Sequence, residues 1–83
     1  MKTHKRKILV VDDNLEFVDL VRRLLESKGF QVSIATNGKT AIEKALSDNP
    51  ELALLDLKLP DIAGEAVLER MKEINKDLSL IHI

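Results

Sequence analysis

The sequence predicts an α/β fold in which a parallel β-sheet is covered by helices on both faces. Two observations lead to this prediction. Apolar runs typical of buried strands alternate along the chain with amphipathic patterns typical of helices. The connections between them are short, which favours right-handed crossovers between parallel strands.

Four strands are expected. Residues 8–11 form a continuous apolar run that is followed by two acids. Residues 52–57 form a second apolar run, interrupted only by Asp56. Both patterns are typical of strands buried on both faces. Residues 30–35, "FQVSIA", alternate apolar with polar side chains. This alternation predicts an edge strand with Phe30, Val32 and Ile34 toward the core and the polar residues toward water. Residues 78–83, "LSLIHI", form the fourth candidate.

Three helices separate these strands. After Asn14, apolar residues recur at spacings of three and four, and Gly29 provides a helix stop. The second helix is expected over residues 39–46, and the third lies after residues 58–64. The inward positions of the second and third helices are predicted to be Ala41, Ile42, Ala45 and Leu46, and Val67, Leu68, Met71 and Ile74.

The composition limits the possible functions. The 83 residues are 45% hydrophobic and 33% charged, which favours one small globular domain. Thirteen basic and 14 acidic residues give a net charge of -1, so nucleic acid and anionic membranes are not expected as main partners. The absence of cysteine, signal peptide and long apolar segment indicates a cytoplasmic protein. Residues 1–7 are interpreted as a basic, solvated tail and residues 8–83 as the domain.

Acidic residues lie where two of the predicted strands end. Asp12 and Asp13 follow the first strand, and Asp56 lies near the end of the apolar run 52–57, the third strand. The carboxyl ends of parallel strands share one edge of a sheet, so neighbouring strands would bring these three carboxylates together. Such a cluster needs a hard cation to offset its repulsion, and Mg²⁺ prefers oxygen ligands of this kind.

Simpler interpretations of these acids stay open. Asp12 and Asp13, with Asn14, could form a strand exit that supplies a helix cap. Asp56 could be an ordinary acid at a strand end, because residues 59–61, "LPD", are typical of the start of a turn.

Together these features resemble the receiver domain of bacterial two-component response regulators. Asp12 and Asp13 match the acidic pair of that family, and Asp56 matches its phosphoacceptor. Residues 58–64, "KLPDIAG", resemble the loop that follows the phosphoacceptor, and the resemblance extends over residues 8–83. It implies a flavodoxin-like open parallel sheet with strand order 2-1-3-4.

The resemblance also implies a chemical role for each site residue. Asp56 would accept a phosphoryl group from a sensor histidine kinase or phosphotransfer protein. Asp13, Asp56 and the backbone carbonyl of Lys58 would bind Mg²⁺ directly, and Asp12 would act largely through water. The domain would be a signalling module and not a turnover enzyme.

The chain also departs from the family pattern. A complete receiver has five strands and five helices, with a Ser or Thr after strand four and a Lys after strand five. This chain ends at Ile83, one residue before the expected hydroxyl, so we expect a truncated receiver that lacks the last strand and two helices. Its apolar fourth strand would then be exposed at an edge, which predicts self-association.

Two other functions are compatible with the sequence. One is a pseudo-receiver that acts as an interaction or dimerisation module without phosphorylation. The other is the amino-terminal half of a Mg²⁺-dependent phosphatase-like enzyme, which is disfavoured because Lys58 occupies the position of that class's usual second acid. His82 is interpreted as a structural residue and not as a phosphohistidine or metal ligand.

Overall fold

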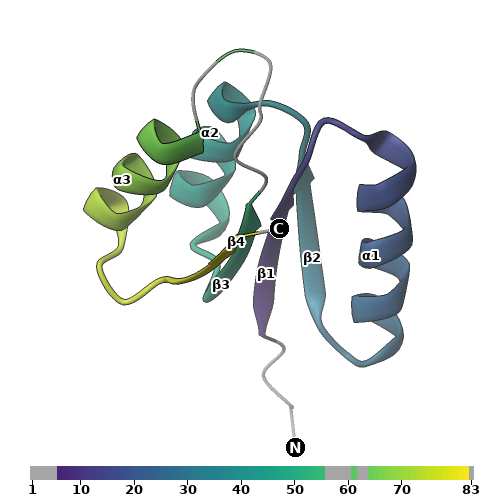
Figure 1. Cartoon of the computed structure of the whole chain (residues 1–83). Helices are drawn as coiled ribbons and strands as arrows, with labels where there is room; N and C mark the ends of the chain where they lie inside the picture. Colours follow the sequence, from purple (N-terminus) through teal and green to yellow (C-terminus); the bar gives the residue numbers. More distant parts are fainter. Residues whose placement is uncertain (1–5, 56–60, 62–63, 83) are drawn as a thin grey trace, which may run out of the picture.

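The computed structural model describes residues 6–55, 61 and 64–82. Its elements alternate strand and helix along the chain (Figure 1). In chain order they are β1 (Lys7–Val11), α1 (Leu15–Ser27), β2 (Gln31–Ala35), α2 (Gly38–Asp48), β3 (Leu52–Leu55), α3 (Gly64–Ile74) and β4 (Ser79–His82). All pairs of neighbouring strands are parallel, and the order is β2-β1-β3-β4. The predicted flavodoxin-like topology is therefore confirmed.

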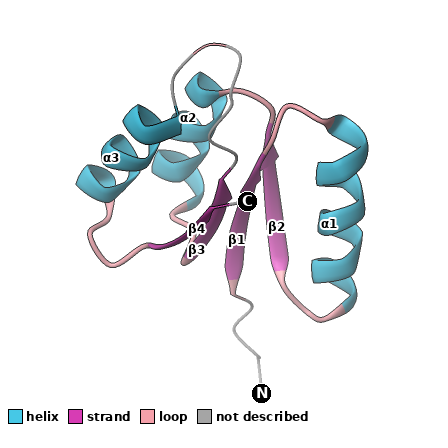
Figure 2. Cartoon of the chain, viewed as in Figure 1, coloured by secondary structure: helices cyan, strands magenta, loops and turns pink. Residues whose placement is uncertain are grey.

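Helices cover both faces of the sheet, as predicted. Figure 2 shows α1 on one side and α2 and α3 on the other. Alternate residues of β1 accordingly belong to two separate clusters. Ile8 and Val10 pack with Val18 of α1, whereas Leu9 and Val11 belong to the larger cluster beneath α2 and α3. Because β1 is covered on both sides, its continuous apolar sequence is explained by burial.

Local capping fixes the ends of the helices. The Asn14 side chain accepts hydrogen bonds from the backbone N–H groups of Glu16 and Phe17, at 3.0 and 3.2 Å, and so begins α1. Gly29 follows α1 with a φ of +94°, which glycine adopts at little cost. The expected helix start and stop are both confirmed.

The structure corrects two details of the predicted second helix and second strand. Leu46, expected to point inward, is 60% exposed, because successive helical residues rotate by about 100° and Ala41 and Ala45 define the buried side. Ser33, expected to face water, is partly buried and donates a hydrogen bond to the Asp48 carboxylate of α2. The edge strand β2 is thus covered by helices on both of its faces.

The other edge of the sheet is more open. Leu80 of β4 packs against the larger cluster, but Ile81 is 49% exposed. Ile81 pairs with Leu54, whose side chain belongs to the cluster on the α1 side. Within the described residues α1 packs on β2 and β1, so β4 has no helix over that face. No helix in this part of the chain is both long and apolar enough to cross a membrane.

Candidate functional site at the carboxyl ends of the strands

Asp12 is fixed in a buried position at the end of β1. Its backbone N–H donates a 3.1 Å hydrogen bond to the carbonyl of Ala35, which extends the contact with β2 beyond the strand. Its carboxylate accepts a 3.0 Å hydrogen bond from the backbone N–H of Asn14. The side chain is only 9% exposed. Asp12 is therefore held against the sheet and oriented by the first turn after it.

Asp13 has a different environment. It is exposed and makes no hydrogen bond or ion pair with the part of the chain that the structure describes. The helix-capping role suggested as an alternative for this segment is performed by Asn14. Asp13 is thus available to bind a ligand, whereas Asp12 also has a structural role.

The third acid, Asp56, and Lys58 lie outside the described residues. Their nearest described neighbour in the chain is Leu55, the last residue of β3, which pairs in register with Val11 of β1. Strands one and three are therefore neighbours, as the argument for a shared acidic site requires. Within the described residues alone, no three His, Asp or Glu side chains gather as a metal site.

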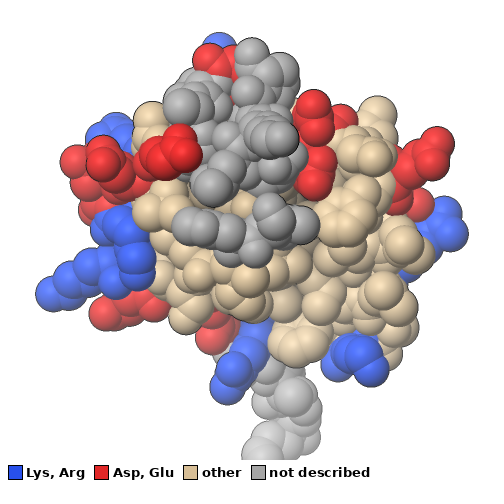
Figure 3. All heavy atoms as spheres, viewed as in Figure 1, with Lys and Arg blue, Asp and Glu red and all other residues tan. Residues whose placement is uncertain are grey.

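The donor atoms of the acidic pair fit a hard cation. Asp12 and Asp13 offer only carboxylate oxygens, the ligand type of Mg²⁺ and Ca²⁺. Figure 3 shows acidic and basic side chains spread over this face, with some acidic groups in its upper half. The two adjacent carboxylates of Asp12 and Asp13 themselves give the end of β1 a negative charge that favours a cation.

Asp61 makes a contact that the sequence did not indicate. Its two carboxylate oxygens accept hydrogen bonds from the backbone N–H groups of Gly38, at 2.7 Å, and Lys39, at 3.1 Å. These are the first residues of α2, more than twenty positions earlier in the chain. The acid that was interpreted as part of a turn therefore caps a helix belonging to another unit of the fold.

Lys72 stabilises the connection between α3 and β4. Its ammonium group donates to the carbonyls of Leu78, at 2.7 Å, and Lys76, at 3.3 Å, and so closes the connection between α3 and β4. The side chain of His82 lies outside the described part.

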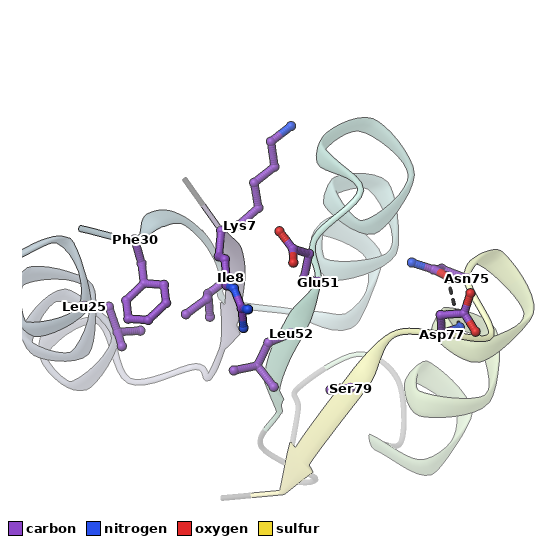
Figure 4. Close-up of a pocket in the computed structure, with 10 residues that line it drawn as sticks. Lys7, Ile8, Leu25, Phe30, Glu51, Leu52, Asn75, Asp77 and Ser79 are labelled. Carbon is purple, nitrogen blue, oxygen red and sulfur yellow. Dashed lines mark hydrogen bonds between the residues drawn. The ribbon is translucent and has the colours of Figure 1, made fainter. Parts of the chain in front are cut away.

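A cavity of about 600 Å³ lies at the other edge of the sheet, where the strands begin (Figure 4). Ile8, Leu25, Phe30 and Leu52 form its apolar lining. Charges of both signs, including Lys7 and Glu51, lie around it. The cavity is therefore separate from the acidic edge.

Comparison with known proteins places this geometry in a family. The family model for the response regulator receiver domain matches residues 8–83. The chain belongs to this family. Sporulation initiation phosphotransferase F of Bacillus subtilis is 36% identical over 75 residues, which cover 90% of this chain and 60% of that protein. The chain thus spans less than two thirds of the length of this relative.

Solved structures agree with this assignment. A CheY-like receiver domain protein from Methanospirillum hungatei superposes with a TM-score of 0.93 at 32% identity, covering 95% of this chain and 63% of that one. A response regulator from Burkholderia pseudomallei, with a phosphorylated aspartic acid, a calcium ion and citrate, has a TM-score of 0.89 at 27% identity. The match covers 94% of this chain and 46% of that protein.

Membership of the family defines the general function. The chain is a receiver domain of two-component systems, a signalling domain rather than a classical enzyme. Receiver domains of this family generally bind Mg²⁺ and interact with sensor histidine kinases or phosphotransfer proteins. The phosphatase-like alternative does not fit this family.

Proposed function

We propose that this receiver domain accepts a phosphoryl group on Asp56 from a sensor histidine kinase or a phosphotransfer protein, in the presence of Mg²⁺. The observation that carries the proposal is the register of Val11 with Leu55. Asp12 follows the first of these residues and Asp56 follows the second, and adjacent strands lie only about 4.8 Å apart. This register supports an Asp56 carboxylate beside Asp12 and Asp13, the arrangement that metal-assisted phosphoryl transfer requires.

The roles of the individual residues follow from this arrangement. An oxygen of the Asp56 carboxylate attacks the phosphorus of a phosphohistidine, the phosphorus–nitrogen bond breaks, and an acyl phosphate forms. Asp13, Asp56 and the Lys58 carbonyl would bind Mg²⁺, while Asp12 would act largely through water. The metal would supply positive charge that offsets the charge of the phosphoryl group. The phosphorylated aspartate in the Burkholderia pseudomallei relative supports this chemistry.

The wider setting is also part of the proposal. Residues 8–83 act as the signalling module, and residues 1–7 form a basic tail outside it. The module works in the cytoplasm without direct contact to nucleic acid. It lacks the turnover chemistry of an enzyme.

Intact mass is the measurement that tests the proposal, because the chain has no tryptophan for a fluorescence readout. The protein is incubated with Mg²⁺ and acetyl phosphate, beside Asp56→Asn. The wild type is expected to gain one phosphoryl group, and Asp56→Asn none. Asp77→Asn is the charge-matched control, because Asp77 is exposed in the connection between α3 and β4.

The same experiment separates the main proposal from the pseudo-receiver. A wild-type chain that binds Mg²⁺ but gains no mass from any donor, including a phosphorylated kinase, is an interaction module. A mass gain retained in Asp56→Asn would place the phosphoryl group elsewhere.

We also propose that the domain self-associates through β4. The supporting observation is that Ile81 is 49% exposed in a strand at the edge of the sheet. Apolar edge strands pair readily with another strand, and a second copy supplies one of identical sequence.

A further inference from the structure

The segment between β2 and α2 contains a reactive pair of residues that the proposed function does not use. Asn37 is the only asparagine of the sequence that is followed by glycine. In such a pair the backbone nitrogen of the glycine can attack the side-chain carbonyl carbon of the asparagine, because glycine has no side chain to hinder the approach. Residues 37 and 38 therefore carry both reacting groups of a spontaneous deamidation.

Both reacting groups are held by hydrogen bonds in the folded chain. The nucleophile is the backbone nitrogen of Gly38, which is buried and whose N–H donates to Asp61 Oδ1 at 2.7 Å. The electrophile is the side-chain carbonyl of Asn37, whose Oδ1 accepts from the backbone N–H of Thr40 at 2.8 Å. Lys39 donates to the second oxygen of Asp61 at 3.1 Å. The fold therefore holds the nitrogen and the carbonyl with separate partners.

Asp61 opposes the reaction in two ways. Its carboxylate holds, by a charge-assisted hydrogen bond, the proton that Gly38 must lose before its nitrogen can attack. Its negative charge also disfavours the anionic nitrogen that this loss creates, because like charges repel at short distance. The reaction therefore needs the start of α2 to separate from Asp61, and its rate depends on how often this local opening occurs.

We propose that Asn37 is a deamidation site and that Asp61 suppresses its reaction in the folded protein. When the contact opens, the Gly38 nitrogen gives its proton to solvent and forms a bond to Cγ of Asn37. The side-chain nitrogen takes up a proton from water and leaves as ammonia, so that a succinimide ring remains. Water then adds to one of the two ring carbonyls, which breaks a carbon–nitrogen bond and gives either aspartate or isoaspartate at position 37.

The two products differ in their effect on α2. Aspartate keeps a side-chain acceptor for the N–H of Thr40 and is a favourable residue at a helix start. Isoaspartate carries the main chain through the former side chain, so the backbone is longer by one carbon and the geometry of the cap is lost. The isoaspartate product is therefore expected to lower the urea midpoint, whereas the aspartate product is expected to leave it nearly unchanged.

Peptide mapping by chromatography and mass spectrometry tests the proposal on the full chain. Deamidation changes the mass of the peptide that contains Asn37, and chromatography separates the two products. Samples are incubated at mildly alkaline pH, either folded or unfolded in urea. The unfolded wild type is expected to react at least about tenfold faster than the folded one, because unfolding removes the Asp61 contacts. Folded Asp61→Ala is expected to react about tenfold faster than the folded wild type, because it loses hydrogen bonds to a charged acceptor.

Gly29→Ala is the matched control, because it weakens the fold at the end of α1 and leaves the contacts of residues 37–39 in place. Its rate in the folded state is expected to stay within about twofold of the wild type, since the reaction depends on local opening at α2. Asp61→Asn keeps one acceptor oxygen and removes the charge. It is expected to give an intermediate rate, and it replaces Asp61→Ala if that variant does not fold.

Three outcomes would overturn the proposal. Equal rates in the wild type and both Asp61 variants would show that Asp61 gives no protection, and so would a folded wild type that reacts as fast as the unfolded chain. Equal acceleration in Asp61→Ala and Gly29→Ala would assign the effect to general unfolding. In urea, Gly38→Ala is expected to slow the reaction, and an unchanged rate would exclude attack by the nitrogen of residue 38. These measurements need neither Mg²⁺ nor a phosphoryl donor, so they are independent of the proposed function.

Discussion

Val11 of β1 and Leu55 of β3 are register partners, and both side chains are 0% exposed in the cluster beneath α2 and α3. Each directly precedes an acid of the candidate site, Asp12 in one strand and Asp56 in the other. The two residues that directly precede these acids in the sequence are therefore part of the buried core.

Leu55→Ala tests this connection. It is expected to lower the free energy of unfolding by about 3 kcal/mol, because it removes buried methyl groups and leaves a cavity. Urea unfolding followed by circular dichroism measures the loss. Leu46→Ala, at a site 60% exposed on α2, is the control and is expected to change stability by less than about 0.5 kcal/mol. Similar losses in the two variants would contradict the assignment of the core.

The strands and the two layers of helices follow from local patterns in the sequence, whereas the strand order was implied by the family resemblance. Runs such as residues 8–11 are apolar at every position, and a strand buried on both faces is the structure that tolerates such a run. The caps at Asn14 and Gly29 are also local, because each acts within a few residues of its helix end. These features could therefore be predicted without tertiary information.

The contacts that escaped prediction join residues far apart in the chain. Asp61 binds the start of α2, and Ser33 binds Asp48 at its end. No periodicity indicates such partners, because they depend on how helices and strands pack together. The acidic site could be predicted only in part. Its strand-end position could be predicted, but the different burial of Asp12 and Asp13 required the structure.

Asp13→Asn is expected to separate metal binding from folding. Without Mg²⁺ its free energy of unfolding is expected to match the wild type within about 0.5 kcal/mol, because Asp13 is exposed and has no polar partner in the described part. Mg²⁺ at about 100 times its dissociation constant is expected to stabilise the wild type by about 2.7 kcal/mol. Asp13→Asn is expected to lose most of this gain at the same Mg²⁺ concentration.

Urea unfolding at several Mg²⁺ concentrations makes this measurement, with Ca²⁺ as a second hard cation. Equal stabilisation of Asp13→Asn and the wild type would exclude Asp13 as a ligand.

The pH dependence of stability is expected to include a contribution from α1. The hydrogen bond from Arg22, followed by the charge of Arg23, holds the pKa of the Asp19 carboxyl below its usual value of 3.8. The hydrogen bond to Asp19 in turn raises the pKa of the Arg22 guanidinium. Because the folded-state pKa of Asp19 is lowered, this contribution is present above the unfolded-state pKa. It is lost as the pH falls through the folded-state pKa.

Urea midpoints at a series of pH values, for the wild type and Asp19→Asn, test this expectation. The wild-type midpoint is expected to fall more steeply below about pH 4. The difference between the two proteins is expected to shrink in about 1 M salt, because the pair is on the surface. Parallel pH profiles would show that the pair contributes nothing to stability.

Ile81→Lys is expected to reduce self-association. A charge on an edge strand opposes pairing with another strand, whereas the present isoleucine is 49% exposed and apolar. Sedimentation velocity over a range of protein concentrations measures the effect. Leu24→Lys, at an exposed position of α1, is the control for adding a charge elsewhere. A wild type that stays monomeric throughout, or equal effects of the two variants, would contradict association through β4.

Gly29→Ala tests the backbone at the end of α1. Gly29 has a φ of +94°, and a Cβ added there would meet no atom within 4 Å, so the cost arises from the backbone alone. A residue with a side chain in this region costs about 1 to 2 kcal/mol, and the urea midpoint is expected to fall accordingly.

Asn49 provides the opposite substitution at the end of α2, because it already has a positive φ, of 49°. Asn49→Gly is therefore expected to keep or slightly raise stability, since glycine adopts this conformation without strain. The contrast in sign distinguishes backbone strain from a general sensitivity of the helix ends. If both substitutions lowered stability equally, the left-handed conformations would not be what determines these two positions.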